Sequence, residues 1–295
     1  MKNLINGLYK VFIYCMLFLW GIITFTTAFD VLICILCNIY NWVKKLPKNT
    51  INKLAFCLFA IVFTSMLLWG INYQVVPSYD LTHIIGKTDS LLLTGVFGSD
   101  PYFSLYPTQI PLTIFIYLLK SVGVFLGYAN PSEFVILYNA FMTSLMLYIL
   151  YKIVCRFSGS CNGFMVMLLA AIYPDFYLYV SYYYTDIISM PFPIFGFYFL
   201  IKAEGSTSIK EKSYLLLSGI LFGIGFKLRV VTLILLIAYI VSLIGEYNLK
   251  LFIKRVFFVL FGIIISIGLY SRVLFPMFDI TIDETLKLPA THWVM

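Results

Sequence analysis

Long apolar runs separated by short polar segments dominate the chain. A helix needs about 20 apolar residues to cross the hydrocarbon core of a bilayer, and several runs meet or approach that length. The pattern predicts an all-α fold, a polytopic transmembrane helical bundle. The apolar runs lie at about 8–42, 54–74, 108–127, 133–151, 161–181, 187–201, 213–226, 230–245 and 256–274.

Composition supports a membrane location. Hydrophobic residues make up 62% of the chain and charged residues 11%, whereas soluble domains carry about 25% charge. The net charge of +7 is spread over short basic clusters between apolar runs, which is the pattern of cytoplasmic loops. We therefore expect a multi-pass protein of the cell membrane, in contact with the lipid bilayer and with no nucleic-acid partner.

The basic clusters also predict sidedness. They contain Lys44, Lys45, Lys48 and Lys53; Lys152 and Arg156; Lys202, Lys210 and Lys212; and Lys250, Lys254 and Arg255. The positive-inside rule places all four in the cytoplasm. This requires that the run 108–127, which contains Lys120, does not cross, so we expect an interfacial or re-entrant helix there. If that run crosses fully, the later loops change sides.

We expect two parts in the chain. Residues 1–53 form an N-terminal membrane segment with a cytoplasmic basic loop, and residues 54–295 form the main transmembrane domain. The run 8–42 is too long for one ordinary span and short for two, so the side of the N-terminus stays open.

Two aspartates stand out against this apolar background. Asp80 ends the sequence Pro77-Ser-Tyr-Asp80, and Asp186 ends Tyr182-Tyr-Tyr-Thr-Asp186. A carboxylate in the bilayer is costly, so one beside a span usually faces water, a partner or a substrate. The charge pattern predicts both on the external face, where they could share one active site. Capping of the following helix is the alternative explanation for Asp186.

Asp80 belongs to a long external loop over 75–107, and long loops are often functional. The loop mixes carboxylates with tyrosines, including Tyr102, and with turn residues, as a site for a sugar or another polyol would. For Asp89 and Asp100 we favour ordinary charged turns, with Asp100-Pro101 as a turn start.

Lys227 and Arg229 follow the run 213–226, which at 14 residues is about 21 Å long and short for a span. We therefore place both side chains below the outer interface. They either snorkel to lipid headgroups or bind an anion in a cavity open to the membrane. His292, near the end of the chain, is either a ligand contact or an ordinary surface residue.

Several motifs resemble those of GT-C membrane glycosyltransferases, nearest to enzymes of the dolichyl-phosphate-mannose protein mannosyltransferase type and the aminoarabinose transferase type. They are the early external aspartate, the Tyr102-Phe103…Tyr106-Pro107 stretch, the second external aspartate, the short helix ending Phe226-Lys-Leu-Arg229, and Thr291-His-Trp293. The resemblance covers about residues 54–295. Its members usually continue with more spans, so we expect this chain to lack the C-terminal part. It also departs from members that carry an Asp-Glu pair, since Leu81 follows Asp80.

The resemblance implies a transferase that moves a sugar from a polyprenyl-phosphate donor to a glycan, lipid or protein acceptor, with inversion. It makes Asp80 the general base and Asp186 a supporting carboxylate. Lys227 and Arg229 would bind the donor phosphate, and Tyr102, Tyr184 and His292 would contact substrate. The sequence predicts no cofactor and no protein metal cluster, and leaves a loosely held divalent cation open.

Two other classes of function fit the sequence. A transporter or lipid flippase also uses charge within the membrane and broken helices, although no internal repeat is apparent. A non-catalytic assembly subunit would tolerate the loss of both aspartates.

Overall fold

The computed structural model describes residues 30–74, 76–243 and 249–286. The chain divides into two compact units, 1–53 and 54–295. In the first unit, residues 30–44 are helical, and α2 (Lys48–Asn72) begins after a short break. The two units coincide with the expected parts, but the role of each stays a prediction.

The described residues are almost entirely helical, as predicted. Five helical stretches are long and apolar enough to cross a membrane by length and composition. They are Lys48–Asn72, Pro107–Phe125, Pro131–Ala171, Thr185–Ala203 and Leu249–Met277. The only strands in the described ranges are the two-residue β1 (Gly98–Ser99) and β2 (Ile280–Thr281), which pair in parallel.

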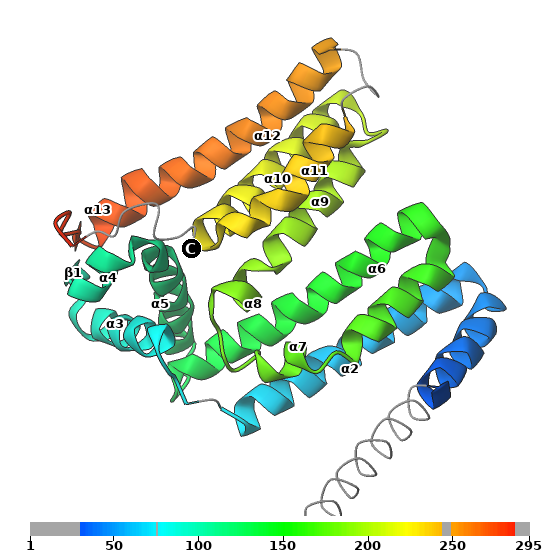
Figure 1. The fold of residues 1–295 in the computed structure, drawn as a ribbon, viewed down its shortest axis with the longest axis horizontal. Coiled ribbons are helices and arrows are strands. Elements are labelled where there is room, and N and C mark those ends of the chain that lie inside the picture. Colours follow the sequence, from blue (N-terminus) through cyan, green and yellow to red (C-terminus); the bar gives the residue numbers. More distant parts are fainter. Residues whose placement is uncertain (1–29, 75, 244–248, 287–295) are drawn as a thin grey trace, which may run out of the picture. The chain divides into compact units, whose positions relative to one another are not determined.

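The runs 133–151 and 161–181 form the two arms of a helical hairpin, α6 (Pro131–Ala171). Gly159 breaks the helix with φ 85°, ψ 164°, a left-handed φ that glycine adopts at little cost. The arms then pack so closely that a Cβ on Gly163 would lie 2.8 Å from the carbonyl oxygen of Tyr151. Figure 1 shows the chain reversing at this point. The second arm ends at Ala171, ten residues before the apolar run does, because Pro174 follows.

The part of α2 within the second unit packs along the first arm of α6. Phe59 and Phe63 meet Phe141 edge to face, with ring centroids 6.3 and 5.9 Å apart, and the Ser144 hydroxyl donates to the sulfur of Met66. Phe56, near the start of α2, meets Tyr148 with ring centroids 6.4 Å apart, whereas Gly70, near the end of α2, lies against Ile136, so the two helices are antiparallel.

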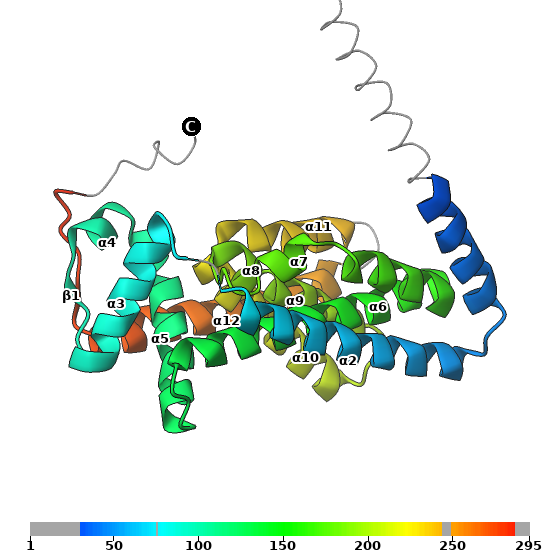
Figure 2. The ribbon, with the colours of Figure 1, turned by 90° about the horizontal axis from the view of Figure 1, so that it is seen from below.

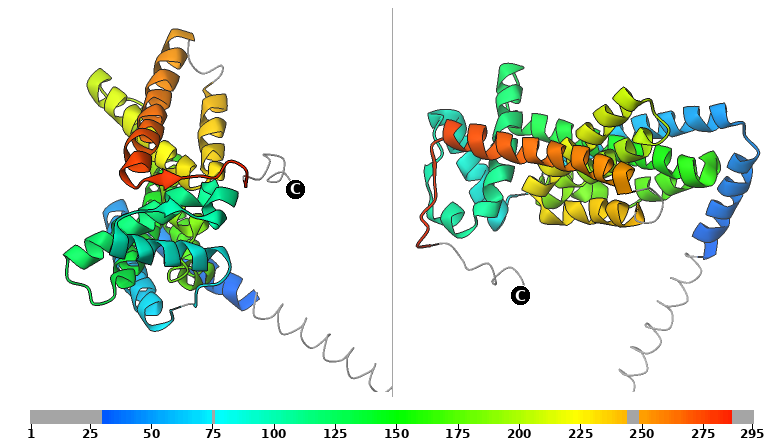
Figure 3. Two further views of the ribbon diagram at one scale, coloured as in Figure 1. Left: turned by 90° about the vertical axis from the view of Figure 1, so that its left-hand side faces the viewer. Right: turned by 90° about the horizontal axis from the view of Figure 1, so that it is seen from above.

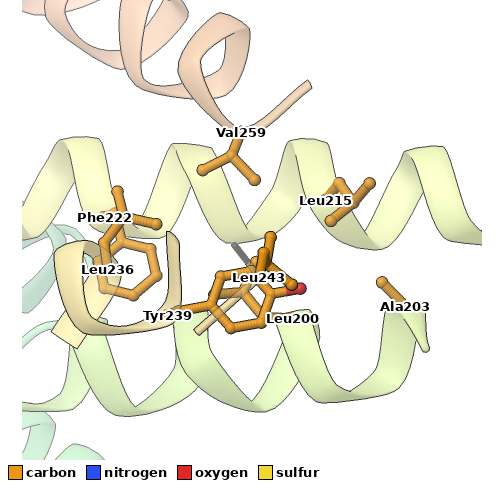
Figure 4. Packing of buried hydrophobic residues seen from close by; sticks show 8 residues of the cluster. All are labelled: Leu200, Ala203, Leu215, Phe222, Leu236, Tyr239, Leu243 and Val259. Atoms are coloured by element: carbon orange, nitrogen blue, oxygen red, sulfur yellow. The ribbon is translucent and has the colours of Figure 1, made fainter. Parts of the chain in front are cut away.

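A second group of helices contains α9 (Pro191–Ala203), α10 (Ser208–Leu228), α11 (Ile234–Ser242) and α12 (Leu249–Leu269). Their shared core is drawn in Figure 4. It consists of Leu200, Ala203, Leu215, Phe222, Leu236, Tyr239, Leu243 and Val259.

Helices α10 and α12 approach closely through small residues. A Cβ on Gly219 would lie 2.1 Å from the carbonyl oxygen of Val259, and one on Gly262 would lie 2.4 Å from the carbonyl oxygen of Leu216. This is the small-residue packing typical of membrane helices.

Helix α10 is longer than predicted, with 21 residues, or about 31 Å at 1.5 Å per residue. The expectation of a short segment over 213–226 was therefore wrong. The charged residues at the start of α10 lower the hydropathy of its first turns, so these turns did not appear as part of an apolar run. The structure shows how the helix accommodates one of these charges. Glu211 pairs with Lys254 at 2.9 Å and with Arg255 at 3.1 Å, which brings two of the predicted cytoplasmic clusters to the same end of the molecule.

The loop 75–107 and the apolar run 108–127 together form a layer of helices that lies crosswise to the long ones. Its elements are α3 (Asp80–Thr94), the short α4 (Pro101–Leu105), the 3-10 turn η1 (Pro107–Gln109) and α5 (Ile110–Phe125). Figures 1, 2 and 3 agree that α5 runs across the direction of α6 and α12. By length and composition α5, with η1, could cross a membrane, so its interfacial placement stays a prediction.

Ion pairs hold this crosswise layer together. Lys120 of α5, only 2% exposed, reaches Asp89 of α3 at 2.5 Å, and Lys87 of α3 pairs with Asp100 at 2.9 Å. Asp100 also caps α4 by accepting from the backbone N–H of Tyr102. Asp89 is exposed and Asp100 is half-buried, and each forms an ion pair that links one element to another.

Candidate active site

Two loops that are far apart in the sequence meet at one end of the second unit. The Ser181 hydroxyl donates to the carbonyl oxygen of Tyr73 at 2.9 Å, and the Asn139 amide donates to that of Val180 at 2.9 Å. The first bond docks the segment that follows α6 onto the end of α2, and the second ties it back to the first arm of α6. The loops carrying Asp80 and Asp186 thus occupy the same end.

Asp80 lies in the first turn of α3 and is half-buried. The residue before it, Tyr79, has φ 50°, which is uncommon for a non-glycine residue and costly enough to be found mainly at functional sites. Tyr184 donates its hydroxyl to Oδ2 of Asp80 at 3.0 Å, and Gln109 donates its amide to the same Tyr184 oxygen at 2.7 Å. A chain of hydrogen bonds therefore orients the Asp80 carboxylate. It runs from η1 through the connection between α6 and α8, residues 172–184, which we call the second loop.

Tyr102 also lies near this carboxylate. Its hydroxyl is buried without a well-formed hydrogen bond in the described structure, yet it lies close enough to Asp80 to feel its charge. The ring stacks on His83 with centroids 4.3 Å apart and planes 9° from parallel. His83 thus fixes the position of a tyrosine that faces the carboxylate.

Both tyrosines are strongly favoured in the neutral form. Burial, followed by the hydrogen bond to Asp80 and its negative charge, raises the pKa of Tyr184 to about 12. Burial and the nearby Asp80 carboxylate raise the pKa of Tyr102 further still. Each hydroxyl therefore keeps its proton at neutral pH and can act as a hydrogen-bond donor beside the carboxylate.

Asp186 forms an ion pair with Arg229, which begins the turn after α10. Arg229 also donates to the hydroxyl of Thr185 at 3.3 Å. The short helix α8 (Thr185–Ser189) has no side-chain hydrogen-bond cap at its start, but Asp186 lies in its first turn, where a carboxylate complements the helix dipole. The pair is open to solvent, with side chains 61% and 40% exposed for Asp186 and Arg229.

Lys227 occupies the last turn of α10 and takes a different partner. Its ammonium lies 5.0 Å from the ring centre of Tyr270, near enough for a cation–π contact. Within the described ranges no carboxylate lies at ion-pair distance from it. Tyr270 begins a π-helical stretch, Tyr270–Leu274, a geometry often found at functional sites.

A pocket of about 330 Å³ opens beside Asp186. Its lining comes entirely from the second loop and the start of the following helix. The residues are Tyr173, Asp175, Phe176, Tyr179, Tyr182, Tyr184, Asp186, Ile187 and Met190. Tyr184 and Asp186 belong both to this wall and to the contacts with Asp80 and Arg229.

The structure therefore brings Asp80, Tyr102, Tyr184, Asp186 and Arg229 into one connected region. Lys227 is two residues from Arg229 but points to a different neighbour, and His292 lies outside the described residues. Across 30–74, 76–243 and 249–286, no three His, Cys, Asp or Glu side chains form a group that could hold a metal ion.

Two contributors to the region were not singled out from the sequence. His83 lies three residues after Asp80, a spacing that puts both on one face of a helix, so this signal was available. Gln109 lies within the Tyr-Pro stretch of the same loop, but its contact with Tyr184 depends on tertiary packing.

Comparison with known proteins identifies the family. The family model for dolichyl-phosphate-mannose-protein mannosyltransferase matches residues 111–275, more than half of the chain. Searches of curated proteins and of solved structures gave no match. The matched range contains Tyr184, Asp186, Lys227 and Arg229, whereas Asp80 and Tyr102 precede it. The chain belongs to the dolichyl-phosphate-mannose-protein mannosyltransferase family and is a membrane glycosyltransferase of the GT-C type.

Proposed function

We propose that this protein transfers a sugar from a polyprenyl-phosphate donor to a glycan, lipid or protein acceptor, with inversion, at the external face of the cell membrane. The observation that carries the proposal is the bridge made by Tyr184. Its hydroxyl holds Asp80, and its neighbour two residues on, Asp186, holds Arg229. This connection between Asp80 and Arg229 supports a single site that contains both the base and the phosphate ligand.

Asp80 acts as the general base in this proposal. Attack of an acceptor hydroxyl on the anomeric carbon requires removal of its proton, and a positioned carboxylate supplies that function. The hydrogen bond from Tyr184 fixes one oxygen of this carboxylate. Because Asp80 lies outside the matched family range, its role rests on this geometry and on the resemblance of the loop.

Arg229 and Lys227 stabilise the leaving phosphate. Negative charge builds up on that group as the glycosidic bond breaks, and fixed cations are most effective where water is scarce. Arg229 has five N–H donors, so it can keep Asp186 as a partner and still offer donors to phosphate. Lys227, without a carboxylate partner, supplies the uncompensated charge.

Asp186 serves mainly to orient Arg229 rather than to take a proton. An exposed carboxylate in an ion pair is a weak candidate for a second base, while the pairing restricts a long flexible side chain. Family membership favours this transferase model over the transporter and assembly-subunit alternatives.

The test is transfer by the full chain in membranes supplied with a labelled polyprenyl-phosphate sugar. We expect Asp80→Asn to lower the rate by about 10²-fold or more, the usual contribution of a general base. Asp279→Asn is the matched control, because Asp279 is exposed and its positive φ suits asparagine. Full transfer by Asp80→Asn would remove Asp80 as the base. Flux of the donor across liposomes without any glycosidic product would favour the transporter instead.

A further inference from the structure

We infer that the pocket lined by residues 173–190 is a subsite for a single sugar ring that is neutral or carries an amino group, and that it discriminates against acidic sugars. The inference rests on the proposed function, since it assigns part of the same site. It is carried by the shape, the aromatic walls and the charge of the pocket.

Aromatic rings form the pocket walls. Tyr173 meets Phe176 with centroids 5.6 Å apart, and Tyr179 meets Tyr182 at 6.0 Å, both nearly edge to face. Tyr173 and Tyr179 remain about half exposed, so their ring surfaces are open to a ligand. A pyranose ring has apolar C–H faces and a polar rim, and such a face packs well on a tyrosine that keeps its own hydroxyl hydrated.

The charge of the lining selects among ligands. It includes the carboxylates of Asp175 and Asp186 and contains no Lys, Arg or His. Arg229 already balances the negative charge of Asp186, whereas Asp175 lies beside the neutral hydroxyl of Tyr173. Asp175 can therefore accept hydrogen bonds from sugar hydroxyls or pair with an ammonium group, and it repels a carboxylate.

The same charge keeps phosphate out of the pocket. In the proposed site the cations Arg229 and Lys227 lie beyond the Asp186 wall, so the phosphate belongs on that side. The sugar ring then lies between the base side, marked by Tyr184, and the phosphate side, marked by Asp186. A volume of about 330 Å³ is at the low end for small-molecule sites, about 300–1,000 Å³, which suits one ring rather than an extended glycan.

Binding can be measured without turnover, by saturation-transfer NMR on the full chain in detergent micelles. The probes are methyl α-mannoside, the methyl glycoside of glucosamine and the methyl glycoside of glucuronic acid. We expect transfer to the ring C–H protons of the first two, and a signal about tenfold weaker for the third, the effect of roughly 1.4 kcal/mol. Tyr179→Ala should abolish the signals, and Asp175→Asn should remove the bias against the glucuronide.

Leu178→Ala is the matched control for Tyr179→Ala. Leu178 is the last residue of the short helix α7 (Asp175–Leu178), directly before Tyr179, and is as exposed as Tyr179, but it does not line the pocket. Equal binding of all three glycosides, or binding unchanged in both Tyr179→Ala and Asp175→Asn, would overturn the inference. If Tyr179→Ala does not fold, the conservative Asp175→Asn still decides the charge preference.

Competition separates the two sources of the ring. If polyprenyl-phosphate mannose displaces methyl α-mannoside while polyprenyl phosphate does not, the subsite holds the donor sugar; if neither displaces it, the subsite holds the acceptor sugar. Asp80→Asn should bind the glycosides normally. Binding that depends on Tyr179 without any transfer by the unaltered chain would therefore contradict the proposed function and leave the subsite standing.

Discussion

At the scale of single residues, Tyr184 joins the parts of the proposed site. Its hydroxyl accepts from Gln109 and donates to Asp80, across 104 positions of sequence. Its raised pKa keeps it a donor over the whole physiological range. A hydrogen bond to a charged group contributes about 1.5–3 kcal/mol, so this bond is strong enough to decide where the carboxylate points.

Tyr184→Phe should therefore slow transfer by about tenfold or more while the protein stays folded. The ring is kept and only the donor to Asp80 is lost, so kcat should fall more than the apparent affinity for donor. Tyr73→Phe is the control, since the Tyr73 contact with the second loop is made by its backbone carbonyl. A kcat unchanged in Tyr184→Phe would contradict the positioning role.

The sequence was informative about which residues stand out and uninformative about their partners. Asp80, Asp186 and Arg229 were conspicuous because charge is rare in an apolar chain. That Arg229 takes Asp186, while Lys227 takes the ring of Tyr270, depends on how α8, α10 and α12 pack. No local pattern encodes such a choice between neighbouring cations.

At the scale of elements, the packing of α10 on α12 depends on glycine. A Cβ on Gly219 would meet the backbone of α12 at 2.1 Å, and backbone cannot move aside as a flexible side chain can. Gly268 on α12 has open space around it, with nothing within 4 Å of an added Cβ. Substitution by alanine is therefore expected to have opposite effects on stability at these two positions.

Gly219→Ala should destabilise the protein by about 1–3 kcal/mol, the usual cost of overpacking, despite the better helix propensity of alanine. Gly268→Ala should be neutral or stabilising by up to about 1 kcal/mol. Thermal unfolding of both variants in one detergent tests the pair. Equal midpoints would show that the α10–α12 contact is looser than the structure has it.

The ends of helices were predictable where the apolar run and the helix end at the same place in the sequence, and not elsewhere. The hairpin turn of α6 lies between the apolar runs 133–151 and 161–181, because Gly159 is in the gap between them. The start of α10 was missed because Lys210, Glu211 and Lys212 lower the hydropathy of its first turns. In the structure Glu211 is paired with Lys254 and Arg255 of α12, and such a tertiary contact leaves no trace in the local hydropathy.

At the scale of the whole molecule, the helices of the second unit fit a bundle with its proposed chemistry at one end. The crosswise layer of α3, α4 and α5 covers the end where the two aspartate loops meet, and the Glu211 cluster joins α10 to α12 where the basic loops lie. The apolar runs predicted the polytopic helical class, and charge counting predicted that the two aspartates lie on one face of the membrane. Whether that end faces outward depends on α5.

Sidedness can be read from single cysteines introduced into a Cys-free chain and labelled in intact cells with a membrane-impermeant thiol reagent. We expect Ser78→Cys, Leu178→Cys and Ala129→Cys to react from outside, and Thr207→Cys only after permeabilisation. Ala129 is decisive because it follows α5: an interfacial α5 leaves it on the same side as Ser78, whereas a spanning α5 carries it to the cytoplasm. All four positions are exposed, so protection reflects sidedness rather than burial. Labelling of Ser78 and Leu178 from opposite sides would contradict the single site, because Asp80 and Asp186 could not then serve one reaction.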